Sequence, residues 1–224
     1  MSSTQRILGV FAKQPTVGRV KTRLAQTTSA EFACRVAEAF LHDSLDRLAS
    51  VAASRMIVYA PADAVGYYSQ LSSGRYALMP QAEGDLGDRL RSFFAWTRQQ
   101  GHAHIVAVGT DSPTLPVEYI EQAFRLLDSH DVVIGPACDG GYYLIGSALT
   151  DLKVFDEIPW STTHVLEATI RRVSEQSARL ALLPPWYDVD TAEDWAMLCG
   201  HVRAMRQAGI DPGTARVERL VRES

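Results

Sequence analysis

Hydrophobic positions along the chain follow two alternating patterns. Short apolar runs bounded by turn residues predict buried strands, and apolar residues spaced three and four positions apart predict helices. The predicted strands cover residues 7–12, 55–61, 76–80, 104–110, 131–137, 141–147 and 178–184. The predicted helices cover residues 29–50, 63–72, 85–100, 116–129, 161–176 and 191–207, the first with Ser29 as its N-cap.

This order of strands and helices predicts an α/β protein with a mainly parallel central sheet. No repeat and no Pro/Gly/Ser-rich linker divides the chain, so we expect one domain over residues 1–207. The polar segment 208–224 is expected to be a C-terminal tail, either helical or disordered. Ligands of such sheets bind beyond the carboxyl ends of the strands, so the residues that follow each strand are the candidates for function.

Composition narrows the class of protein. Hydrophobic residues make up 46% of the 224 and charged residues 21%, which is ordinary for a globular domain. The net charge of −4, without a basic tail, argues against general nucleic-acid binding. No apolar run approaches the ~20 residues of a membrane span, and the one near the N-terminus is too short for a signal peptide. Three separated cysteines without a CxxC pair argue against disulfides and structural zinc, so we expect a cytoplasmic protein.

Positive charge is concentrated after the first predicted strand. The stretch FAKQPTVGRVKTRLA (11–25) contains Lys13, Gly18 and three alternating cations, Arg19, Lys21 and Arg23. Glycine permits a tight turn, and alternating cations in an extended loop share one face. Arg and Lys supply the charge and donors that phosphate groups require. We interpret the stretch as a phosphate site, with a solvated surface loop or helix start as the alternative.

Carboxylates follow two later strands. VAVGTDSP (106–113) places Asp111 at the carboxyl end of a strand, and Asp188 and Asp190 alternate in an extended segment before the last predicted helix. Carboxylate oxygens are the ligands that Mg²⁺ and Mn²⁺ prefer. Each position also has a structural alternative: Asp111 as the cap of the following helix, and Asp190 or Thr191 as the cap of the last one.

Two glycine-containing segments complete the candidates. Asp139, Gly140 and Gly141 predict a tight connection between two strands, and the glycines also leave space for a ligand with Asp139 at its rim. Gln81 and Gly87 follow another strand, where a helix N-terminus and a glycine-rich backbone can line a nucleotide pocket. The Walker, GxGxxG, HExxH and GxSxG motifs are absent from the sequence, which disfavours the enzyme classes that use them.

Six segments, taken in order, resemble a known family. They are FAKQPTVGRVKTRL, QAEGDLGDRL, GTDSPTLP, GPACDGGYYLIG, PWST and DVDTAEDW, and they span about residues 6 to 200. They resemble a family of small bacterial glycosyltransferase-like proteins with the GT-A, nucleotide-diphospho-sugar transferase fold, some of whose members are assigned to arsenosugar biosynthesis. The resemblance implies a single domain with a mixed, mainly parallel sheet flanked by helices.

The resemblance also implies where the ligands bind. The loop after the first strand is expected to hold the nucleotide, and Asp111, Asp188 and Asp190 are expected to hold Mg²⁺ or Mn²⁺. Two departures stand out: the first loop lacks the Ala-Gly-Gly signature of typical nucleotidyltransferases, and Asp-Ser-Pro replaces the DxD of many GT-A enzymes. The expected nucleotide-binding residues are Phe11, Ala12, Lys13, Gly18, Arg19, Lys21, Arg23, Gln81 and Gly87.

The function expected from these features is that of a metal-dependent glycosyltransferase. It would use a nucleotide-diphosphate sugar and a small-molecule acceptor, with Asp139 as the base if the reaction inverts configuration. One alternative is a nucleotidyltransferase that transfers an NMP group from an NTP to a phosphorylated acceptor and releases pyrophosphate. Another is a nucleotide-binding protein without catalysis. No feature of the sequence indicates the oligomeric state.

Overall fold

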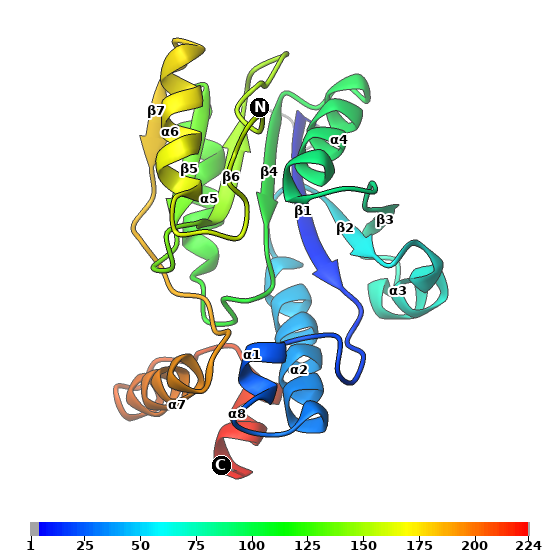
Figure 1. Cartoon of the computed structure of the whole chain (residues 1–224), viewed down its shortest axis with the longest axis vertical. Helices are drawn as coiled ribbons and strands as arrows, with labels where there is room; N and C mark the ends of the chain where they lie inside the picture. The colour runs from blue at the N-terminus through cyan, green and yellow to red at the C-terminus, as the bar shows by residue number, and fades with distance from the viewer. Residues whose placement is uncertain (1–4, 224) are drawn as a thin grey trace.

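A seven-stranded sheet with helices on both faces forms the centre of the molecule (Figure 1), which a computed structural model describes over residues 5–223. The strand order is β3-β2-β1-β4-β6-β5-β7. β6 is antiparallel to its neighbours β4 and β5, and the other paired strands are parallel. This confirms the predicted mixed, mainly parallel sheet. The strands are β1 (Arg6–Lys13), β2 (Ser54–Ala60), β3 (Ala77–Pro80), β4 (His104–Val108), β5 (Val132–Pro136), β6 (Tyr142–Ser147) and β7 (Leu180–Leu182).

Successive residues of each strand enter opposite cores. Leu8 faces the core formed with α2 (Ala30–Leu48) and α5 (Val117–Leu126). Ile7 faces the core formed with α4 (Leu86–Gln99) and α6 (Val165–Glu175). The side-chain period of two in a strand therefore explains why short apolar runs, rather than alternating ones, mark these doubly covered strands.

A third core lies beyond the carboxyl edge of the sheet. The first half of α2 packs there against α1 (Thr22–Ala25), α7 (Ala192–Gln207) and α8 (Ala215–Glu223) through residues such as Leu24, Phe40 and Trp195. The second half of α2 packs against the sheet through Leu41 and Leu45. We call α1, α7 and α8 the lower helical group. Because α2 packs into both cores, it joins this group to the sheet, below which the group lies (Figure 1).

Helix boundaries follow local capping. The Ser29 hydroxyl accepts a hydrogen bond from the Phe32 amide, which confirms it as the N-cap of α2. α6 begins four residues later than predicted, because Ser161 is left-handed (φ 63°) and the Thr162 hydroxyl closes a turn onto the Pro159 carbonyl. β4 and β7 are shorter than predicted. A 3₁₀ turn, Ala62–Ala64, precedes α3 (Val65–Ser72). Within residues 5–223, no helix has the length and apolar character needed to cross a membrane.

Candidate active site

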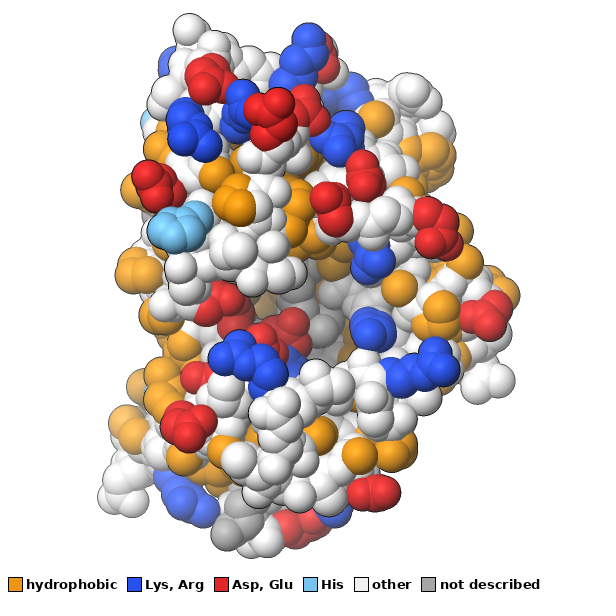
Figure 2. Space-filling model, in the orientation of Figure 1, with side chains coloured by type: hydrophobic (Ala, Val, Ile, Leu, Met, Phe, Trp, Pro, Cys, Tyr) orange, Lys and Arg blue, Asp and Glu red, His pale blue; other side chains and the backbone are white. Residues whose placement is uncertain are grey.

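The candidate site lies between the sheet and the lower helical group. Figure 2 shows a hollow at this level of the molecule, with acidic and basic side chains on its rim. A cavity of about 230 Å³ opens here, with an aromatic and aliphatic wall and polar groups at one end. Its apolar wall includes Phe11 of β1, Leu86 and Leu90 of α4, and Tyr142 of β6. Its polar end includes the carboxylates of Asp111 and Asp188.

Two segments far apart in the sequence form the acidic end of the cavity. The Val189 amide donates to the Asp111 carbonyl at 3.0 Å. The Ser112 hydroxyl donates to Oδ1 of Asp188. These bonds fix the segment after β4 against the segment before α7, so the carboxylates of both segments face the same space.

Polar contacts behind the cavity hold this pair of segments. The hydroxyls of Thr114 and Tyr187 are 2.8 Å apart, and the Tyr187 hydroxyl also lies 2.6 Å from Nδ1 of His201 on α7. From α2, the Arg47 guanidinium donates to the carbonyls of Pro113 and Leu115. The turn that carries Asp111 is therefore fixed from α2 and α7.

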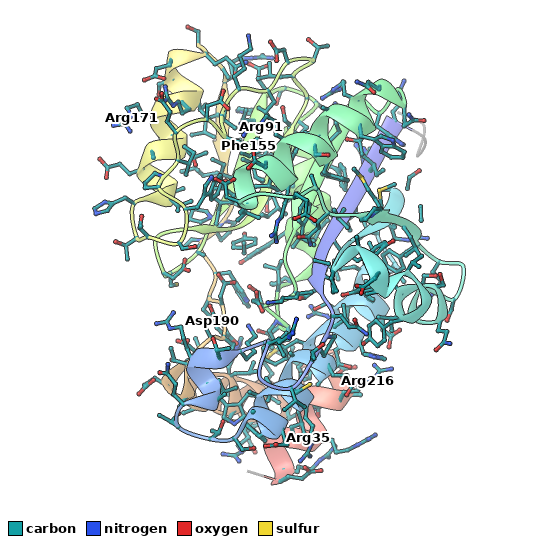
Figure 3. The ribbon with its side chains drawn as sticks, turned by 45° about the vertical axis from the view of Figure 1, so that its right-hand side comes forward. Arg35, Arg91, Phe155, Arg171, Asp190 and Arg216 are labelled. Carbon is teal, nitrogen blue, oxygen red and sulfur yellow. The ribbon has the colours of Figure 1, made fainter. Side chains whose placement is uncertain are left out.

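Lys21 lies between two of the predicted metal ligands. Its ammonium donates to Oδ1 of Asp190 at 2.8 Å and to Oδ1 of Asp111. The Lys21 side chain is only 5% exposed, whereas those of Asp111 and Asp190 are 52% and 42% exposed. Burial by itself would lower the pKa of Lys21, but the two carboxylates raise it above its ordinary value. Figure 3 shows Asp190 on the segment that enters the lower helical group, close to α1.

Capping leaves both carboxylates free for this contact. Thr191 is the N-cap of α7 and forms a capping box with Asp194, so the side chain of Asp190 is not the cap. α5 begins at Val117 with Pro116 in the N-cap position, so the alternative interpretation of Asp111 as a helix cap is wrong. The capping roles are filled by other residues, and two of the predicted ligands, Asp111 and Asp188, line the cavity.

Negative charge is concentrated at this end of the cavity. Burial, together with the nearby carboxylates of Asp111, Asp139 and Asp190, raises the pKa of Asp188 to about 6, against the lowering effect of the Ser112 hydroxyl. Asp139 belongs to the turn between β5 and β6, as predicted, and its Oδ1 accepts from the Gly141 amide at 2.9 Å. Two of these carboxylates, Asp111 and Asp190, contact the buried Lys21 ammonium, and Asp188 experiences the negative charge of Asp111, Asp139 and Asp190. In the part of the chain that the structure describes, no three Asp, Glu, His or Cys side chains converge as a ready metal-ligand set.

The cations of the basic loop after β1 lie in two environments, with the Lys21 side chain buried and Arg19 and Arg23 exposed. Gly18, at φ 75°, permits a turn in which the Arg19 amide donates to the Thr16 carbonyl, and Lys13 Nζ donates to the Arg19 carbonyl at 2.8 Å. Arg19 and Arg23 are exposed, and neither pairs with an acidic side chain within residues 5–223. The prediction that the cations share one face of an extended loop is wrong, because Thr22–Ala25 form a helical turn. Lys21 consequently points inward.

The remaining predicted residues have distinct places. Phe11 lines the cavity and packs edge-on against Phe93, while Ala12 is buried. The Gln81 amide donates to the carbonyls of Ala12 and Val58, at 3.3 and 2.9 Å. These contacts give Gln81 a structural role between β1 and β2.

Gly87 lies in the first turn of α4 against an indole ring. A Cβ at this position would lie 2.6 Å from Nε1 of Trp160, so glycine allows the close approach. The sequence prediction omitted Leu86, Leu90 and Tyr142 of the cavity wall, whose apolar character is also that of ordinary core residues. It also omitted Arg47, since nothing local marks a helix arginine as the support of a distant turn.

Comparisons with known proteins show the family to which the chain belongs. Residues 41–162 match the model of a family described as uncharacterized protein conserved in bacteria (DUF2064). The chain belongs to this family. A candidate nucleotide-diphospho-sugar transferase from Desulfovibrio desulfuricans G20 has a similar solved structure, with a TM-score of 0.87 and 30% identity over 100% of this chain and 98% of that one. No curated protein matches the chain.

More distant solved structures share the fold. A cytidylyltransferase from Leptospira borgpetersenii has a TM-score of 0.57 at 11% identity, over 98% of this chain and 94% of that one. The 4-diphosphocytidyl-2C-methyl-D-erythritol synthase from Anaerococcus prevotii has a TM-score of 0.58 at 8% identity, over 90% and 100%. At these identities the likeness concerns the fold alone. The chain has a fold like that of the candidate nucleotide-diphospho-sugar transferase, with which it shares 30% identity.

Proposed function

We propose that this DUF2064 protein is a metal-dependent transferase that uses a nucleotide-diphosphate sugar as its donor. The observation that carries the proposal is the contact of Lys21 with Asp111 and Asp190 at the carboxyl edge of the sheet, where Asp111 lines a cavity and the exposed cations Arg19 and Arg23 flank Lys21 in the sequence. Support also comes from the relative that is 30% identical over the whole chain and is named a candidate nucleotide-diphospho-sugar transferase.

The residues fit a divalent cation by their chemistry. Asp111, Asp188 and Asp190 offer carboxylate oxygens, the donor type that Mg²⁺ and Mn²⁺ prefer. The raised pKa of Asp188 reflects buried, concentrated negative charge that a cation would relieve. These three residues are the proposed ligands, although Lys21 separates two of them in the ligand-free arrangement. When bound, a divalent ion would neutralise charge on the departing diphosphate.

The side chains of the chain itself have separate roles in this proposal. Arg19 and Arg23 bind the diphosphate from the solvent side, where both side chains are exposed. Phe11 and Tyr142 contribute an apolar wall that excludes water from the donor. Asp139, exposed at the rim, takes the proton of the acceptor hydroxyl as that oxygen attacks the anomeric carbon. Bond formation to the acceptor breaks the bond to the diphosphate oxygen.

A ligand panel followed by product analysis tests the proposal. Thermal unfolding is measured with Mg²⁺ or Mn²⁺ and UDP, GDP, UDP-glucose, GDP-mannose, dTDP-glucose or each of the four NTPs. We expect one nucleotide sugar and its diphosphate to raise the melting temperature only with metal, because ligand binds the folded state. Asp111→Asn should remove the metal-dependent part. A response confined to one NTP, with pyrophosphate release, would favour the nucleotidyltransferase, and binding without turnover would favour the non-catalytic alternative.

A further inference from the structure

Lys21 occupies the space between two of the proposed metal ligands. Its ammonium contacts both Asp111 and Asp190, which belong to segments 79 residues apart, and it lies beneath their more exposed carboxylates. The contact on the carboxylates is therefore made from the protein side, and both carboxylates remain partly exposed to solvent. Lys21 is the cation that bridges these two ligand candidates.

The backbone is arranged to deliver this side chain. Lys21 is left-handed (φ 45°, ψ 44°) at the position before α1, a conformation that a residue with a Cβ adopts at an energetic cost. Its ammonium also lies 5.5 Å from the centre of the Phe40 ring, in the core beneath the site. The left-handed residue lets the chain enter α1 while the lysine turns away from Arg19 and Arg23, which stay in solvent.

We propose that the Lys21 ammonium and a divalent cation are alternative occupants of the space between Asp111 and Asp190. The inference rests on the proposed function in that it assigns a metal to these carboxylates. Two cations that share the same pair of oxygens within hydrogen-bonding distance repel each other strongly in a partly buried site. Metal entry therefore requires Lys21 to leave, and the nearest use for the released ammonium is the diphosphate already held by Arg19 and Arg23.

If the Lys21 ammonium and a divalent cation compete for these carboxylates, removal of Lys21 should tighten metal binding. Mn²⁺ binding to the nucleotide-free, full-length protein is measured by electron paramagnetic resonance. We expect Lys21→Met to raise the Mn²⁺ affinity by at least about tenfold, since the competing charge is gone. Lys21→Arg keeps the competing cation and should stay within about threefold of the unmutated protein.

A nearby charge provides the matched control. Arg23→Met also removes one positive charge close to the site, but Arg23 does not contact either carboxylate. Its effect should be at most about threefold, because exposed charges are screened by salt. Equal or weaker Mn²⁺ binding by Lys21→Met would overturn the inference. So would an equal gain from Arg23→Met, which would show a general charge effect, and so would the absence of Mn²⁺ binding by every variant.

A measurement on the unmutated protein covers the case in which Lys21→Met fails to fold. Lysine ammonium groups that are buried in ion pairs give resolved ¹⁵N signals, and Lys21→Arg assigns the one from Lys21. Saturating Mg²⁺ should remove or shift that signal, and an unchanged signal at saturation would overturn the inference. Both experiments omit nucleotide. A failed donor panel would thus reject the transferase while leaving the competition result to stand by itself.

Discussion

The Ser112 hydroxyl donates a hydrogen bond to Oδ1 of Asp188, across 76 residues of sequence. Asp188 is half-buried, and the charged groups that act on it are the carboxylates of Asp111, Asp139 and Asp190. The single hydroxyl only partly offsets the cost of burying this charge. The ionised Asp188 side chain therefore destabilises the folded state, and it adds to the negative charge beside the cavity.

The stability of the protein without metal should depend on Asp188 between about pH 4 and pH 6. Because its pKa is raised to about 6, the folded state holds more protons than the unfolded state in this window, and stability falls as pH rises. Asp188→Asn should remove this slope. With EDTA present, it should raise the free energy of unfolding at pH 7 by up to about 3 kcal/mol and have little effect at pH 4.

Urea unfolding at several pH values, without metal, checks this expectation. Asp151→Asn is a suitable control, since Asp151 is an exposed residue that pairs with Lys153. It should change stability by less than about 0.5 kcal/mol at any pH. A pH slope that is the same in Asp188→Asn and the unmutated protein would show that another group is responsible.

Arg47 should be necessary for the turn that carries Asp111. Its guanidinium supplies donors to two carbonyls, those of the buried residues Pro113 and Leu115, so Arg47→Ala would leave them without partners. We expect a loss of about 2–4 kcal/mol in the free energy of unfolding. Arg47→Lys, which lacks the forked donor geometry, should recover only part of it. Lys153→Ala, at an exposed pair, controls for loss of charge, and an equal loss there would contradict this role.

The phosphate role of the basic loop has its own test. Arg19→Ala combined with Arg23→Ala should weaken a nucleoside diphosphate at least about tenfold and leave the bare nucleoside nearly unchanged, because charge-assisted bonds to phosphate are lost. Isothermal titration of both ligands, with pyrophosphate as a probe that lacks the base, measures the difference. Similar weakening of nucleoside and diphosphate would place the phosphate site elsewhere. Both arginines are exposed, so the melting temperature should barely change.

Features that depend on local patterns could be predicted from the sequence. The apolar run at 7–12 became β1, and Ser29 caps α2, because strand burial and capping involve residues close in the chain. The inward turn of Lys21 could not be predicted in this way. Its contact with Asp190 spans 169 residues, and its direction follows from a left-handed backbone that no residue type in KTRL requires. The role of Arg47 could not be predicted either, since its acceptors lie 66 and 68 residues away in another segment.

The last helix depends on one buried carboxylate. Asp43 on α2 is 2% exposed and accepts from the backbone amides of Arg216 and Val217 and from the Arg216 guanidinium, so it caps α8 from a distance. Figure 3 shows Arg216 in the lower helical group. Asp43→Asn keeps the shape but loses the charge and replaces one of the two acceptor oxygens with an NH₂ donor. We expect it to cost about 2–4 kcal/mol of unfolding free energy.

Asp46→Asn is the matched control for this cap, because Asp46 also pairs with Arg216 but is exposed. Its cost should be below about 1 kcal/mol. Hydrogen exchange should separate local from global effects. In Asp43→Asn, the amides of α8 should lose more protection, relative to the unmutated protein, than those of β4, because α8 packs outside the central sheet and can open by itself. If both variants lost equal stability, or α8 kept its protection, the cap would not be what holds α8 on α2. The attachment of α8 would then depend on its apolar core, through residues such as Val217 and Leu220, and on ion pairs such as Arg206–Glu218.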